Sequence, residues 1–139
     1  MEAFSQVNWL AVPLAGVITM FVGGLWYGPL FGQAWMDEVG LTKEEIEASG
    51  TPTQAMIKSF IASIVLGIGM SLVIAWSGVP VGDWVGGAII GLLTALLVVG
   101  AAVFPNYAFE DKSLRHFMIH IGATTVSMAL IGAMLAVWR

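Results

Sequence analysis

The stretch that decides the fold is the run from Ser59 to Ser77, which reads SFIASIVLGIGMSLVIAWS. It contains no Asp, Glu, Lys or Arg, and it has the length of about 20 residues that an α-helix needs to cross the hydrocarbon core of a bilayer. Such a helix bonds its backbone donors and acceptors within its own segment, as lipid requires. The run therefore predicts a membrane-spanning α-helix.

Three further runs of similar length also lack Asp, Glu, Lys and Arg, and they cover residues 9–28, 84–104 and 117–138. None of the four runs alternates apolar and polar residues, so barrel strands are not predicted. The sequence predicts an all-α, polytopic membrane protein with a single domain over residues 1–139. Its four transmembrane helices, in a small bundle, are expected at about 8–28, 53–77, 83–104 and 114–138.

Composition supports this class and excludes others. The chain has 139 residues, of which 58% are hydrophobic and only 10% charged, and a soluble domain of this size would have to leave much of that apolar surface in water. Five Lys and Arg in a chain of net charge -4 argue against nucleic acid as a partner. The absence of cysteine excludes disulfides and thiolate metal sites.

The segments between the runs carry start and stop signals for helices. Thr42 and Glu45 have the spacing of a capping box, which predicts a short surface helix over about 42–49. Asp83 is expected to cap the third span. The residues 104–107, which include Pro105, predict a turn at the end of that span. Aromatic residues near the expected span ends match the belt found at membrane interfaces.

The basic residues predict an orientation. Four of the five lie in or beside the two loops that follow the first and third spans: Lys43, Lys58, Lys112 and Arg115. Because cytoplasmic loops carry an excess of Lys and Arg, the loops 29–52 and 105–113 are expected in the cytoplasm and both termini outside.

Glycines recur at a spacing of four, which brings them to one face of a helix. Gly78, Gly82 and Gly86 form one such set, and the two sets that lie in or beside predicted spans are Gly24, Gly28 and Gly32, and Gly87 and Gly91. Small residues let helices approach closely in lipid, so both sets are predicted to pack helices together. The contacts can lie within one bundle or between copies of the chain. A bundle of four short helices has little interior of its own, which favours a homo-oligomer.

Polar residues form a stripe on the fourth span, where His116, His120, Thr124 and Ser127 share one helix face. Three interpretations stand side by side: hydrogen bonding inside the bundle, the lining of a polar path, and a metal site at His116 and His120. A metal site needs a third ligand that the sequence does not identify. The other candidates for a path or ligand contact are Asn8, which can also cap the first span, Ser59 and Ser63.

No catalytic motif is present, so a non-enzymatic protein without a cofactor is predicted. The leading hypothesis is a homo-oligomeric channel or transporter for a small solute or ion in the lipid bilayer. The alternative is an accessory or scaffold membrane protein that binds a protein or lipid and transports nothing. A metal-dependent intramembrane enzyme ranks last.

Two landmarks in the chain resemble a known family. The first is Val7–Val12 followed by LWYGPLFG at Leu25–Gly32 and then Trp35, and the second is NYAFE at Asn106–Glu110. The chain is similar to the bacterial membrane proteins grouped as domain of unknown function seventeen sixty-one. This resemblance implies four helices in a bacterial inner membrane, and it brings no activity. It draws attention to Asn8, Trp9, Trp26, Tyr27, Pro29 and Glu110, whereas the two histidines lie outside its pattern.

Overall fold

The predicted fold class is confirmed, because the computed structural model, which describes residues 2–139, contains helices and no strand over that range. The α-helices are α1 (Glu2–Ser5), α2 (Val12–Leu25), α3 (Gly32–Val39), α4 (Lys43–Ala48), α5 (Thr51–Ser77), α6 (Trp84–Leu93), α7 (Ala101–Phe109) and α8 (Leu114–Val137). Two π-helical segments, η1 (Trp26–Leu30) and η2 (Thr94–Gly100), join α2 to α3 and α6 to α7. Four stretches are long and apolar enough to cross a membrane: Val12–Leu30, Thr51–Ser77, Trp84–Phe109 and Leu114–Val137.

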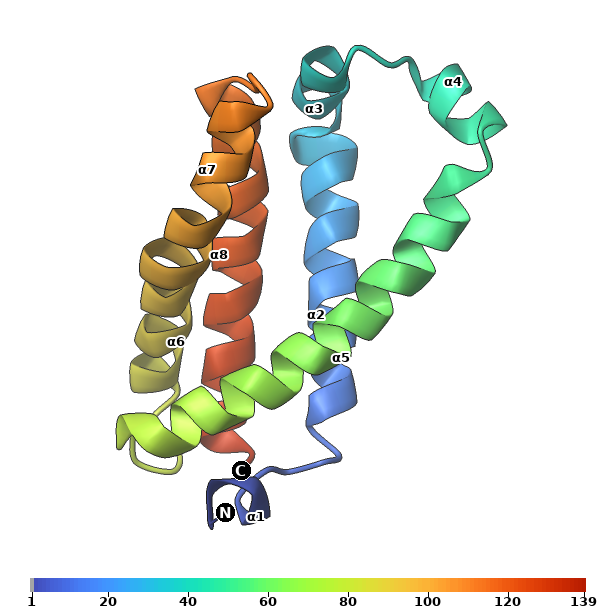
Figure 1. Cartoon of the computed structure of the whole chain (residues 1–139). Coiled ribbons are helices and arrows are strands. Elements are labelled where there is room, and N and C mark those ends of the chain that lie inside the picture. The colour runs from blue at the N-terminus through green and yellow to red at the C-terminus, as the bar shows by residue number, and fades with distance from the viewer. Residues whose placement is uncertain (1) are drawn as a thin grey trace.

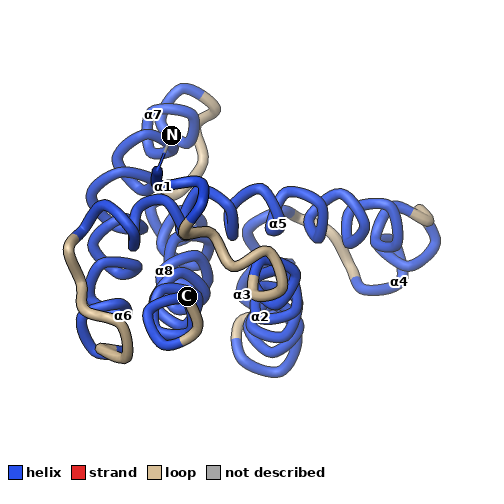
Figure 2. Tube along the Cα trace, turned by 90° about the horizontal axis from the view of Figure 1, so that it is seen from below, coloured by secondary structure: helices blue, strands red, loops and turns tan. Residues whose placement is uncertain are grey.

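The four spans form a layer of three with the fourth crossing it. Figure 1 shows α2, α8 and the continuous α6–η2–α7 span running roughly parallel, while α5 crosses them diagonally. Figure 2, seen from below, shows α6, α8 and α2 in one row and α5 lying across it. We call the end with α3, α4 and the α7–α8 turn the loop end. The opposite end, which holds both chain termini, is the terminal end.

The contact between α6 and α8 is the closest in the protein, because glycines meet there. A methyl group added at Gly87 would overlap the Gly132 carbonyl oxygen, and one at Gly91 would overlap the Met128 carbonyl oxygen. The backbone also joins the two segments, since the Gly82 N–H donates to the Ala136 carbonyl at 2.9 Å. Small residues thus hold these spans together, as expected where lipid supplies no hydrophobic drive.

Small residues also mediate the crossing of α2 and α5. A Cβ at Gly67 would lie 2.7 Å from the Ala15 Cβ, and a Cβ at Gly16 would lie 2.6 Å from the Phe60 ring. Ser63 and Ser71, one turn to either side of Gly67, are buried as well. This side of α5 therefore faces inward and is already occupied by α2.

The buried core lies in the half of the molecule toward the terminal end. Its largest fully buried side chains are Met70 and Ile74 from α5 and Met128, Ile131 and Leu135 from α8. Toward the loop end α5 diverges from the layer (Figure 1), and residues 53–59 are all exposed. The loop-end half of the layer is therefore not covered by α5.

Two helix boundaries differ from the expectation. The third span does not turn at residues 104–107 but continues as α7 through Pro105 to Phe109. Proline removes one backbone donor, and in a span the remaining helical bonds keep the backbone satisfied, so the helix persists. The first helix begins at Val12 rather than near residue 8, because the Asn8 side chain accepts a bond from the Leu10 N–H at 3.0 Å and holds a turn there.

Candidate functional site

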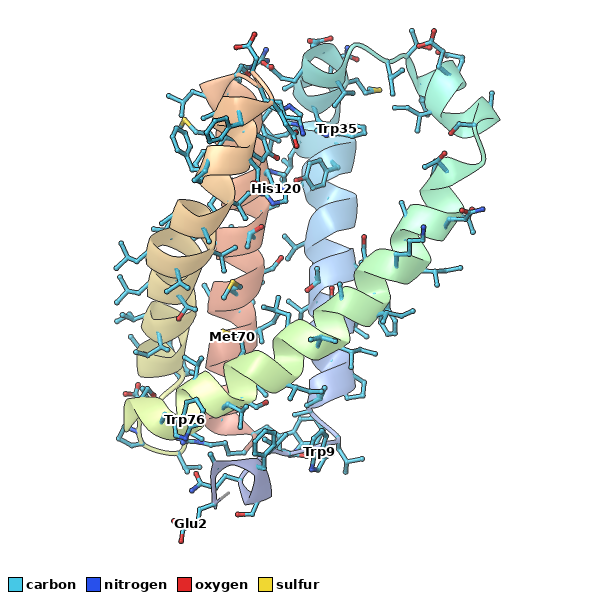
Figure 3. The ribbon with its side chains drawn as sticks, in the orientation of Figure 1. Glu2, Trp9, Trp35, Met70, Trp76 and His120 are labelled. Carbon is cyan, nitrogen blue, oxygen red and sulfur yellow. The ribbon has the colours of Figure 1, made fainter. Side chains whose placement is uncertain are left out.

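The polar stripe of α8 is covered along only part of its length. Ser127 is buried in the half where α5 crosses α8, whereas His116, His120 and Thr124 on the same face are only half-buried. Figure 3 shows His120 in the loop-end half, away from α5 and at the same end as Trp35. We call His116, His120 and Thr124 the uncovered face. These three residues are only half-buried because α5 diverges from the layer between the level of Ser127 and the loop end.

Tyr107 on α7 packs against both histidines of the uncovered face. Its ring centroid lies 5.2 Å from that of His116 and 6.0 Å from that of His120. Phe117 completes the group, with its ring centroid 5.5 Å from Tyr107 in an edge-on contact. We call these four side chains the Tyr107 cluster. Within residues 2–139 no hydrogen bond joins the side chains of Tyr107, His116 or His120 to another residue.

Four charged groups beside the cluster form two ion pairs, while the neighbouring Asp111 is in no ion pair among residues 2–139. The Lys112 ammonium lies 2.5 Å from a Glu110 carboxylate oxygen and 5.0 Å from the Tyr107 ring centroid. The hydrogen bond to Glu110 raises the pKa of Lys112 above its usual value. Arg115 contacts Glu38 at 3.4 Å, and the Ser113 hydroxyl donates to the same carboxylate at 2.5 Å. The surroundings of the Tyr107 cluster therefore carry little net charge.

The first family landmark ties the first span to α8 at the level of His120. Its sequence forms the π-helical turn η1, in which Gly28 leaves helical geometry and Pro29 follows. The Trp26 indole N–H donates to the Ile119 carbonyl at 2.8 Å, and a Cβ at Gly122 would lie 2.6 Å from the same indole. The landmark thus positions α2 against α8, which is a structural role.

The proposed path residues do not gather in one place. Ser63 is buried on the side of α5 that packs on α2, and its hydroxyl donates to the Ser59 carbonyl at 2.7 Å. The Thr124 hydroxyl donates to the His120 carbonyl at 3.1 Å. Asn8 lies at the terminal end in an open hollow with Ser5, Gln6 and Arg139. Of the predicted set, the structure brings together His116, His120 and Thr124.

Within the part of the chain that it describes, the structure adds no third ligand to the metal site that the sequence suggests at His116 and His120. Among residues 2–139 no third His, Asp or Glu joins His116 and His120 in a group able to hold a metal ion. Their shared neighbour is instead the Tyr107 ring.

The two glycine sets differ in what they face. Gly87 and Gly91 lie against α8, as described above. Gly24 and Gly28 have no atom within 4 Å of an added Cβ, and Gly32 meets only the Tyr27 carbonyl of its own turn, at 2.6 Å. The first set therefore packs no second helix of the same chain.

Two residues of this region were not singled out as site candidates from the sequence. Tyr107 lies within the second landmark, and that position is the signal in the sequence that could have selected it. Glu38 stands in an acidic stretch of the sequence, and its side chain is only 16% exposed because it bonds Ser113 and Arg115. No local pattern marks that tertiary contact.

Four apolar spans arranged in this way define a polytopic, all-α membrane protein. The sequence model of one family, described as Protein of unknown function (DUF1761), matches residues 10–136, and the chain belongs to that family. No curated protein and no solved structure matches the chain.

Proposed function

We propose that this protein is a non-enzymatic homo-oligomer that forms a path for a small polar solute or ion where its copies meet. The observation that carries the proposal is the uncovered face of α8, where His116, His120 and Thr124 are half-buried, α5 does not cross, and the Tyr107 ring of α7 packs on the two histidines. Ionisable side chains within spans face protein or water because contact with lipid is costly. A second copy of the chain provides both.

The interior of a single copy favours a path between copies over a path through one. The buried cluster of Met70, Ile74, Met128, Ile131 and Leu135 closes the terminal half with apolar side chains. The buried serine hydroxyls of Ser63 and Ser71 donate to carbonyls of their own helix. A solute crossing one copy would have to displace this core.

The orientation follows from the basic residues. Lys43, Lys112 and Arg115 lie at the loop end, together with the first turns of α5 that carry Lys58. We place the loop end in the cytoplasm of a bacterium and the terminal end outside the inner membrane. The uncovered face then opens toward the cytoplasm.

Cysteine cross-linking tests the assembly cleanly because the chain has no native cysteine. Thr124→Cys places a thiol on the uncovered face. Val126→Cys is the matched control: it lies two residues away at almost the same depth, on the opposite side of α8, and is 39% exposed. Both variants are oxidised with copper phenanthroline in native membranes and separated on non-reducing gels.

The proposal predicts disulfide-linked dimers for Thr124→Cys and monomers for Val126→Cys. Proteoliposomes then report transport by stopped-flow light scattering with glycerol, urea and potassium chloride, and Thr124→Phe should block whichever flux is seen. Cross-linking through Val126 alone, or through neither residue, would contradict the assembly. Cross-linking through Thr124 without flux of any of these solutes would favour the accessory or scaffold role.

A further inference from the structure

We infer that the Tyr107 cluster is a binding site for a neutral, planar, lipid-soluble carbonyl compound of the quinone class, whose apolar tail lies in the groove between α7 and α8. This inference goes beyond the proposed function. It shares His116 and His120 with the uncovered face, but it does not require a second copy, because the side chains concerned all come from one chain.

The first step is the set of unused hydrogen-bonding groups. The Tyr107 hydroxyl and the imidazoles of His116 and His120 form no hydrogen bond within residues 2–139. They converge around one ring, with centroids 5.2 and 6.0 Å from Tyr107. These side chains are half-buried and none of their polar atoms is among the described buried atoms that lack a partner, so a phenol and two imidazoles remain accessible to donate to carbonyl oxygens.

The second step is the charge of the surroundings. Lys112 is paired with Glu110, and Arg115 with Glu38. A bare anion would find no free cation beside the cluster among the described residues, and a metal cation would find only two imidazoles. The site therefore suits a ligand without net charge.

The third step is shape. Phe104, Phe117, Tyr107 and His116 follow one another in edge-on contacts, with ring centroids 5.1, 5.5 and 5.2 Å apart. A further flat ring can join such an aromatic row in an offset-stacked or edge-on contact. A planar head group fits such a surface better than a branched one does.

The fourth step is an apolar groove that adjoins the cluster at Phe117. It has a volume of about 440 Å³ and is lined by Leu96, Gly100, Ala101, Phe104, Pro105 and Phe117. The groove lies along η2 and α7, beside the contact that Phe104 of α7 makes with Phe117 of α8. It opens to the surface that lipid covers, so a ligand with a hydrocarbon tail can enter from the bilayer.

The test uses the full chain in nanodiscs and decylubiquinone as the probe. Quenching of the intrinsic tryptophan fluorescence is titrated, since Trp35 lies at the same end of the molecule as His120 (Figure 3) and the Trp26 indole bonds the Ile119 carbonyl. The proposal predicts saturable quenching, weakened at least tenfold in Tyr107→Phe and in His120→Leu. His120→Gln, which retains a side-chain donor, should recover part of the affinity. Phe109→Leu, at a side chain that is 94% exposed near the same end, is the matched control and should bind as the unaltered protein does.

Circular dichroism and gel filtration establish that each variant is folded, and Tyr107→Phe keeps the ring contacts if His120→Leu does not fold. Non-saturable quenching, or equal affinity in all variants, would overturn the proposal. So would His120-dependent binding of zinc chloride without any binding of decylubiquinone, because the cluster would then be a metal site. If Thr124→Cys forms no cross-linked dimers but decylubiquinone still binds, the proposed oligomer is rejected and this inference stands.

Discussion

The glycine contact between α6 and α8 gives the sharpest stability prediction. In Gly91→Ala the new methyl group would overlap the Met128 backbone carbonyl, which cannot rotate away as a side chain can. Overpacking of this kind costs about 1–3 kcal/mol, and the rigid partner places it at the upper end. Alanine regains about 1 kcal/mol of helix propensity over glycine. The expected net loss of stability is therefore about 2 kcal/mol, from the difference of these two terms.

Gly24→Ala is the matched control, because an added Cβ there meets no atom within 4 Å. It should change stability by the propensity term alone, a gain of about 1 kcal/mol. Reversible unfolding in dodecylmaltoside with increasing dodecyl sulfate, followed by circular dichroism, measures both variants. Equal effects of the two substitutions would refute the claim that Gly91 supports a close helix contact and that Gly24 faces open space in one copy.

Three further predictions concern other contacts. Trp26→Phe removes the bond to the Ile119 carbonyl and should destabilise the protein by about 1 kcal/mol in the same assay, whereas an unchanged midpoint would deny the anchoring role of η1. Glu110→Gln should lower the pKa of Lys112 toward its ordinary value of 10.5, measured by nuclear magnetic resonance of labelled lysine; an unchanged pKa would exclude Glu110 as the cause. Because the pKa is raised in the folded state, the stabilisation by this pair is present below pH 10.5 while Glu110 is ionised, and it is lost as the pH rises through the raised value. The stability difference between Glu110→Gln and the unaltered protein should therefore disappear at high pH. In detergent, amides of residues 53–59 in α5 should exchange with deuterium faster than those around Met70 and Ile74, as mass spectrometry can show; equal protection would mean that α5 does not diverge.

Features with a local cause were predictable from the sequence. The capping box of Thr42 and Glu45 is present with both of its bonds, and the Asp83 side chain caps α6 through the Gly86 N–H at 2.9 Å. The lengths of the charge-free runs likewise gave four spans, because hydropathy and bilayer thickness act on each segment alone.

Features with a tertiary cause were not predictable in the same way. The spacing of Gly24, Gly28 and Gly32 indicates that one helix face carries small residues. The side of α2 that faces α5 is set instead by tertiary packing, in which Gly16 lies against Phe60 and Ala15 lies against Gly67. The continuation of the helix through Pro105 depends on the bonds around it. The contact of Tyr107 with His116 and His120 depends on the position of α7 relative to α8, which η2 determines.

The measurement that tests the central claim most directly is a cryo-electron microscopy structure of the protein in nanodiscs. The account predicts several copies that meet over the uncovered face, with His120 and Thr124 of each copy turned toward a shared wet space and α5 at its border. Single copies, with lipid density over His120 and Thr124, would contradict it. So would copies that meet through the open Gly24–Gly28 side of α2 while the uncovered face remains in lipid.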